Sequence, residues 1–235
     1  MLFILVSQNS VVQIEKKNIE LYEEIGSGSF GTVYRAKWLT CNTIIAVKQL
    51  QLRHLNKEAE EQIYREISVL NRLRHPNIVS LLGTCMEKEY YALVIEYMPL
   101  GSLYKLIHRE KVNLSWVNRL SIASDAARGI SYLHSQTPRI LHCDIKSLNM
   151  LIQQNHPKYH IKVCDFGTAE IRDETTRQVK QNEIKYDIKI SKHLNTVFLH
   201  LFPEIPKLRV STHWLGLLQK YYAIILIQEK VTFIA

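Results

Sequence analysis

The sequence predicts an α+β fold in two lobes, the first rich in strands and the second rich in helices. Residues 19–50 place β-branched and apolar side chains on both sides of a glycine-rich turn, which is typical of antiparallel strands. Residues 116–134 instead repeat apolar side chains at the helical period, over a stripe broad enough for a mostly buried helix. With 235 residues, the chain is long enough for two lobes that share a cleft.

Composition excludes several classes of protein. The chain is 46% hydrophobic and 22% charged, as an ordinary soluble globular protein is. Its net charge of +8 fits a polyanionic ligand, but the positive charges are scattered and no aromatic residues alternate with them, so we expect no nucleic-acid partner. Cys41, Cys85, Cys143 and Cys164 lie at no metal-ligand spacing, which predicts reduced thiols in a cytoplasmic protein. No apolar stretch reaches the ~20 residues of a membrane-spanning helix.

The glycine-rich turn reads IGSGSFGTVY over residues 25–34. Its glycines have no Cβ, so the backbone can approach a triphosphate and direct N–H groups at it. A Rossmann unit uses the same glycine spacing but then opens a helix, whereas residues 32–34 are β-formers. Lys48 follows on a third predicted strand. A plain hairpin turn and a solvated strand lysine are the alternative for these residues.

The next segments predict a helix and two strands. Residues 55–73 repeat apolar side chains at the period of an amphipathic helix. Glu66 lies next to the apolar stripe, where its carboxylate can hold the Lys48 ammonium; a solvated helical face is the alternative. Residues 78–83 and 90–97 predict strands, and a connector with proline and glycine follows the second of them.

Residues 141–149, LHCDIKSLN, combine three groups that suit phosphoryl transfer. The Asp144 carboxylate can accept a proton from an attacking hydroxyl, the Lys146 ammonium can neutralise phosphate charge, and the Asn149 amide can ligate a hard cation. Asp165, in the sequence Asp-Phe-Gly, adds the carboxylate oxygen that Mg²⁺ prefers. Asn149 and Asp165 are each, taken alone, more typical of a turn than of a metal site, but their order behind a glycine turn and a strand lysine favours a metal site.

In this order the motifs resemble those of a eukaryotic protein kinase over residues 19–176, in the tyrosine-kinase-like branch with Raf-like and receptor-associated kinases. The resemblance implies a two-lobed protein-kinase-like fold. Residues 1–18 would be an N-terminal leader and residues 19–97 the N-lobe. The hinge and a partial C-lobe would occupy residues 98–181, and residues 182–235 would form a divergent tail that does not match the family.

The resemblance also implies a function: transfer of the γ-phosphate of ATP, with Mg²⁺, to serine and threonine hydroxyls of proteins in signal transduction. The alternative is a nucleotide-binding pseudokinase or scaffold with little catalysis. The implied catalytic residues are Lys48, Glu66, Asp144 and Lys146, and the implied metal ligands are Asn149 and Asp165. The implied nucleotide contacts are Ile25, Gly26, Ser27, Gly28, Ser29, Phe30, Gly31, Val33, Ala46, Lys48, Glu96, Met98 and Leu151. Ordinary packing and strand-end turns explain the hinge and apolar contacts equally well.

Two departures from the family pattern bear on activity. Cys143 replaces an arginine that pairs with activation-loop phosphate in many kinases, and a thiol cannot donate a charged fork. We therefore expect activation that does not read a phosphate at this position. Beyond the Asp-Phe-Gly motif, no Ala-Pro-Glu follows, and the Phe-Pro-Glu of residues 202–204 is the nearest string. The sequence thus predicts an incomplete lower lobe.

Overall fold

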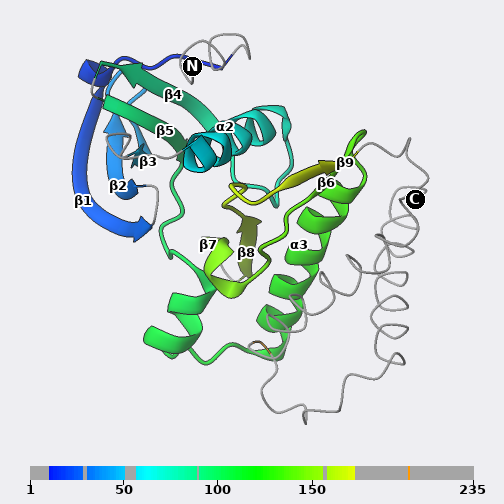
Figure 1. The fold of residues 1–235 in the computed structure, drawn as a ribbon. Helices are drawn as coiled ribbons and strands as arrows, with labels where there is room; N and C mark the ends of the chain where they lie inside the picture. Colours follow the sequence, from blue (N-terminus) through cyan, green and yellow to red (C-terminus); the bar gives the residue numbers. More distant parts are fainter. Residues whose placement is uncertain are drawn as a thin grey trace, which may run out of the picture.

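The computed structural model describes residues 11–28, 31–50, 57–88, 90–155, 158–172 and 201, and it confirms a two-lobed α+β fold (Figure 1). The small lobe is a five-stranded antiparallel sheet in the order β1-β2-β3-β5-β4, preceded by the short turn η1 (Lys16–Asn18). Its strands are β1 (Ile19–Gly28), β2 (Gly31–Trp38), β3 (Thr43–Leu50), β4 (Leu81–Glu87) and β5 (Tyr90–Glu96). The strands predicted around the glycine turn are therefore confirmed.

Helix α2 (Lys57–Arg72) packs against this sheet through the apolar stripe that the sequence predicts. Ile63, Ile67 and Leu70 are almost completely buried, in one core cluster with Leu50 of β3. This spacing of three and four residues places them on one helical face. The predicted residues 55 and 56 lie outside the described part of the chain.

The large lobe is built on helix α3 (Trp116–His134), whose bounds are those that the sequence predicts. The Ser115 side chain accepts a hydrogen bond from the Asn118 N–H, which is an ordinary N-cap. The helix is less buried than the sequence predicts: Leu120 is 52% exposed, because it lies about 200° around the helix from the fully buried Ile122. The buried stripe is thus narrower than predicted.

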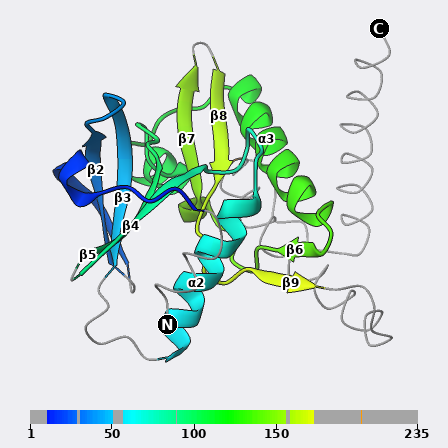
Figure 2. The ribbon, with the colours of Figure 1, turned by 90° about the horizontal axis from the view of Figure 1, so that it is seen from above.

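Short elements cover one side of α3. The antiparallel pair β7 (Met150–Asn155) and β8 (Lys158–Val163) lies beside it, as Figure 2 shows. The remaining elements are η3 (Lys105–Arg109), β6 (Arg139–Leu141), η4 (Ser147–Asn149) and β9 (Glu170–Arg172), and β6 pairs with β9. The predicted strands at residues 150–152 and 161–163 are confirmed as parts of β7 and β8.

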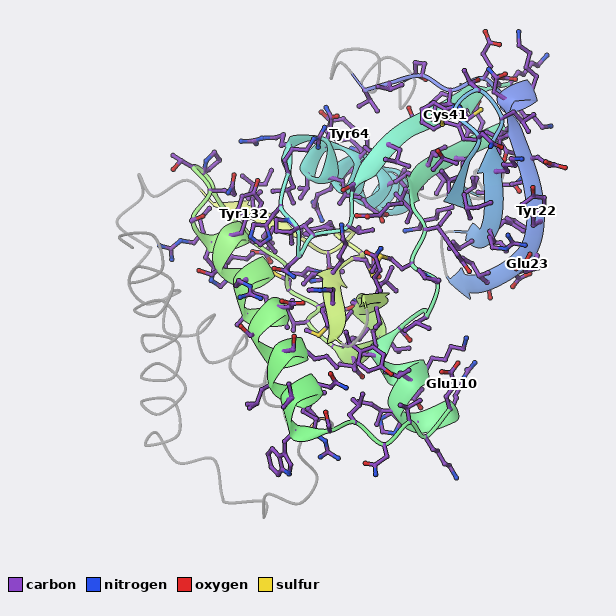
Figure 3. The ribbon with its side chains drawn as sticks, turned by 180° about the vertical axis from the view of Figure 1, so that it is seen from behind. Tyr22, Glu23, Cys41, Tyr64, Glu110 and Tyr132 are labelled. Atoms are coloured by element: carbon purple, nitrogen blue, oxygen red, sulfur yellow. The ribbon has the colours of Figure 1, made fainter. Side chains whose placement is uncertain are left out.

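The segment between α2 and β4 joins the two lobes. The Val79 N–H donates to the Val163 carbonyl, and the Val163 N–H donates to the Asn77 carbonyl, each at 2.9 Å. Tyr132, labelled on α3 in Figure 3, stacks its ring on His75 with centroids 4.6 Å apart. These contacts correct the predicted strand at residues 78–83: β4 begins only at Leu81, because the preceding residues bond to the large lobe.

Two further observations concern the class of protein. In the part of the chain that the structure describes, no helix is both long and apolar enough to cross a membrane. The four cysteines all lie within that part, and none of them forms a disulfide.

Candidate active site

Lys48 and Glu66 form a buried ion pair between β3 and α2. The Lys48 Nζ donates to both carboxylate oxygens of Glu66, at 2.9 and 2.7 Å. The two side chains are only 17% and 7% exposed. Burial opposes the charge on Lys48, but the Glu66 charge and hydrogen bonds, with the charge of Asp165, outweigh it and raise the pKa of Lys48. The lysine is therefore a fixed cation at neutral pH.

Asp144, Lys146 and Asn149 meet within the loop that leads into β7. The Lys146 ammonium donates to Asp144 Oδ2 at 2.5 Å, and the Asn149 Nδ2 donates to the same oxygen at 3.0 Å and to the Asp144 carbonyl at 2.9 Å. Burial raises the pKa of Asp144, but the hydrogen bond and charge of Lys146, with the Asn149 hydrogen bond, lower it below its ordinary value. The carboxylate stays ionised at neutral pH.

His142 connects this loop to the segment that carries Asp165. Its Nε2 donates to the Cys164 carbonyl at 2.9 Å, while the Asp144 N–H donates to its Nδ1 at 3.3 Å. Burial is the largest influence on this imidazole and lowers its pKa, so the ring is neutral. The ring also packs on Phe166, with centroids 4.9 Å apart. His142 thus fixes the position of Asp165 relative to Asp144.

Two residues of this region adopt the left-handed backbone region that non-glycine residues rarely occupy. Cys143 has φ 62° and Asp165 has φ 65°. Such conformations cluster at functional sites, where the surrounding structure enforces them. The Cys164 N–H donates to the Asn149 carbonyl at 3.0 Å, which holds the two strained segments together.

Charged groups of both lobes influence the thiol of Cys164, a half-buried residue. Burial raises the pKa of this thiol most, and the negative charges of Asp165 and Glu66 raise it further. The positive charges of Lys48 and Lys146 oppose that effect. Because all four charges act on one group, the structure brings together the predicted residues of β3, α2, the loop before β7 and the Asp-Phe-Gly segment.

The glycine turn is described on both sides of its tip. Gly26 and Gly28 have open space where a Cβ would stand, and Ile25 and Ser27 are exposed. A Cβ on Gly31 would lie 2.0 Å from the Gln49 carbonyl oxygen of β3, so strand packing alone requires this glycine. The sequence motif did not reveal that second reason. The predicted contacts Ser29 and Phe30 lie outside the described residues.

The remaining predicted nucleotide contacts follow from the sheet and the connector. Val33 pairs with Lys48, and Ala46 pairs with Ile95 across the sheet. Met98 is buried, and Leu151 packs on the main core cluster.

Glu96, another predicted nucleotide contact, forms an ion pair that the sequence did not predict. Its carboxylate accepts from the Ser80 N–H at 2.6 Å and from the Lys162 Nζ at 2.8 and 2.9 Å. Lys162 lies on β8 of the large lobe, so this ion pair crosses between the lobes. A charged residue between two apolar residues of a short strand, Ile161 and Val163, was the only signal in the sequence.

Asn149 and Asp165 are the two oxygen donors that the sequence predicts for a cation. Within the described ranges, no group of three or more His, Cys, Asp or Glu side chains gathers to hold a metal ion. An amide and one carboxylate suit Mg²⁺, which usually takes only one or two protein carboxylates and completes its shell with phosphate oxygens and water. The donor set therefore fits this cation when a nucleotide supplies the other ligands.

Fold and site together define a protein kinase domain, and comparisons with known proteins agree. A family model described as protein kinase domain matches residues 19–191, so the chain belongs to the protein kinase family. It is 41% identical over 163 residues to the probable serine/threonine-protein kinase drkB of Dictyostelium discoideum, covering 68% of this chain and 23% of that protein. It is 41% identical over 160 residues to the serine/threonine-protein kinase CTR1 of Arabidopsis thaliana, covering 67% of this chain and 19% of that protein.

A third relative is the probable serine/threonine-protein kinase SIS8 of Arabidopsis thaliana, 43% identical over 159 residues that make up 68% of this chain and 15% of that protein. The chain thus spans between 15% and 23% of the length of these three relatives.

Proposed function

We propose that the chain is an ATP-dependent protein serine/threonine kinase that transfers the γ-phosphate of ATP to hydroxyl groups of protein side chains. The site in which Lys48 pairs with Glu66, and in which His142 joins the Asp144 loop to the segment of Asp165, carries this proposal. Four groups from distant parts of the sequence meet there with charges that suit a triphosphate and an attacking hydroxyl. The names of the relatives support serine/threonine specificity, as does the lysine at position 146.

The small lobe supplies the groups that hold the nucleotide. Lys48, kept cationic and oriented by Glu66, pairs with the α and β phosphates. The open space above Gly26 and Gly28 lets the backbone approach the phosphates. The adenine would lie between Ala46 and the other predicted apolar contacts, against the backbone of the connector between the lobes.

The loop before β7 supplies the groups that move the proton. The Asp144 carboxylate, ionised at neutral pH, orients the substrate hydroxyl and accepts its proton as the oxygen attacks the γ-phosphate. Lys146 neutralises charge on the transferred group, since its ammonium already lies against Asp144. Asn149 and Asp165 would hold Mg²⁺, which neutralises charge on the phosphate oxygens when it is bound.

Transfer of labelled γ-phosphate from ATP to a generic basic protein substrate tests this function. We expect Mg²⁺-dependent transfer by the wild-type chain and a loss of about 10²–10⁴-fold in Asp144→Asn, the range that a positioned general base contributes. Lys48→Met should reduce transfer to background. Wild-type transfer no greater than that of Asp144→Asn would remove the proposal.

We also propose a cellular location for the protein. Reduced cysteines at all four positions support a cytoplasmic location, where thiols are kept reduced. Phosphorylation of protein hydroxyls there is a signal-transduction activity.

A further inference from the structure

Residues 11–16 cover the free edge of β4 and lie outside the region that the family model matches. The Ile14 N–H donates to the Thr84 carbonyl at 2.8 Å, and the Thr84 N–H donates to the Val12 carbonyl at 2.8 Å. Gln13 therefore forms a parallel bridge with Thr84. Figure 1 shows this dark blue segment running along the β4 side of the sheet. It extends the sheet as an added strand does.

The side chains of this segment divide into buried and exposed positions. Val11 and Ile14 are 9% and 4% exposed, and each joins a hydrophobic core cluster. Val12, between them, is 56% exposed. The Gln13 amide donates to the Thr84 hydroxyl at 3.0 Å, which fixes the register of the added strand.

Gly83 of β4 provides the space into which Ile14 fits. A Cβ on this glycine would lie 2.7 Å from Ile14 Cδ1 and 2.7 Å from the Val12 carbonyl oxygen. Real Cβ contacts essentially never come so close, and one of these atoms belongs to the backbone. Any larger residue at position 83 would therefore displace the segment.

The far end of the segment makes polar contacts with the β4–β5 hairpin. The Lys16 N–H donates to Glu87 Oε1 at 2.7 Å. The Lys16 ammonium lies 4.7 Å from the centre of the Tyr90 ring, in a cation–π contact. Residues 11–16 thus contact the β4 edge and its hairpin through backbone hydrogen bonds, two apolar side chains and one cation.

We propose that this edge is a docking site for an extended segment with apolar side chains at its first and fourth positions and a cation at its sixth, occupied in cis by residues 11–16. Val11 belongs to the same core cluster as Ile63 and Ile67 of α2, the helix that carries Glu66.

Displacing the segment in the full chain and adding it back as a peptide tests the site. In Ile14→Asp, the buried position becomes charged and the edge is vacated. A fluorescent peptide of residues 9–18 should then bind this variant, measured by polarisation. It should bind the native chain about tenfold or more weakly, because the tethered segment competes at an effective concentration on the order of mM. Val12→Asp, at the exposed position, should behave as the native chain does.

Three results would overturn the site: no binding to Ile14→Asp, equal binding to all chains, or undiminished binding when Gly83→Val is added to Ile14→Asp. Native-chain hydrogen exchange gives a measurement that needs no variant, since the amides of Ile14 and Thr84 should both be protected. Fast exchange at Ile14 with protection at Thr84 would contradict occupancy. A native dimer in sedimentation whose copies exchange the segment would overturn occupancy in cis.

Discussion

Asp144 is a carboxylate on which opposing influences act. Burial raises its pKa, whereas Lys146 and Asn149 lower it, and the net effect is a lowered value. Because its pKa is lower in the folded chain than in the unfolded one, the carboxylate stays ionised until the pH falls through the lower, folded-state pKa. Because Lys146 is the main cause of the lowered pKa, its ammonium keeps the proposed base ionised at mildly acid pH.

We therefore predict that Lys146→Met moves the acid limb of the kcat/KM profile for phosphate transfer to higher pH, in addition to slowing the reaction. The profile should be measured from about pH 4 to pH 8, which brackets ordinary carboxyl values. Lys105→Met is the matched control, since Lys105 pairs with Glu110 on the exposed η3 turn. An acid limb unchanged by Lys146→Met would show that another group limits the rate at low pH.

We hypothesise that Cys143 makes the activity independent of a phosphate on the activation loop. Its thiol hydrogen bonds to the Leu141 carbonyl and carries no charge that could bind a phosphate. We predict that glutamate at Thr175 and Thr176, which lie outside the described residues, changes the transfer rate little in the native chain. The same changes should alter the rate in a Cys143→Arg background. A large effect in the native background would contradict the hypothesis.

At the scale of elements, the Glu96–Lys162 pair ties the end of β5 to β8. The side chains are 23% and 15% exposed, so solvent screens the pair only partly. Removing Lys162 leaves the Glu96 carboxylate with the Ser80 N–H alone. A hydrogen bond to a charged group contributes about 1.5–3 kcal/mol.

We predict that Lys162→Met lowers the melting temperature by roughly 5 °C, at about 2–4 °C per kcal/mol for a chain of this size. Calorimetry should show a smaller effect for Lys105→Met, because that pair is 49% and 39% exposed and such pairs contribute about 0–1 kcal/mol. Equal shifts for the two variants would mean that the interlobe pair adds nothing beyond a surface contact.

Local pattern predicted some elements better than others. The period of apolar residues predicted α3 with its bounds, since helix formation depends on near neighbours. The start of β4 was predicted three residues early, because Asn77 and Val79 form hydrogen bonds with β8, far away in the sequence. Gly31 shows the same limit: its contact with Gln49 exists only once β2 and β3 are paired.

At the scale of the whole molecule, the candidate site depends on the position of the two lobes relative to each other. Lys48 and Glu66 come from the small lobe, and Asp144 and Asp165 come from the large one. Motif chemistry predicted these residues because phosphate, proton and cation each demand particular side chains. The supports that align them, such as the bond from Val79 to β8, carry no such chemical requirement and were not predicted.

In the proposed mechanism Lys48 of the small lobe binds the nucleotide and Asp144 of the large lobe accepts the proton, and this difference yields a last prediction. A ligand that binds only the folded state stabilises it by about 2.7 kcal/mol at a concentration of 100 times its Kd. Mg-ATP should therefore raise the melting temperature of the native chain, and also of Asp144→Asn, since in the proposed mechanism Asp144 acts on the hydroxyl and not on the nucleotide. Lys48→Met should lose most of the shift, because the substitution removes the ammonium that we propose pairs with the α and β phosphates and leaves Glu66 as an unpaired buried charge. Melting curves with and without Mg²⁺ measure this, and a native chain that Mg-ATP does not stabilise would contradict nucleotide binding.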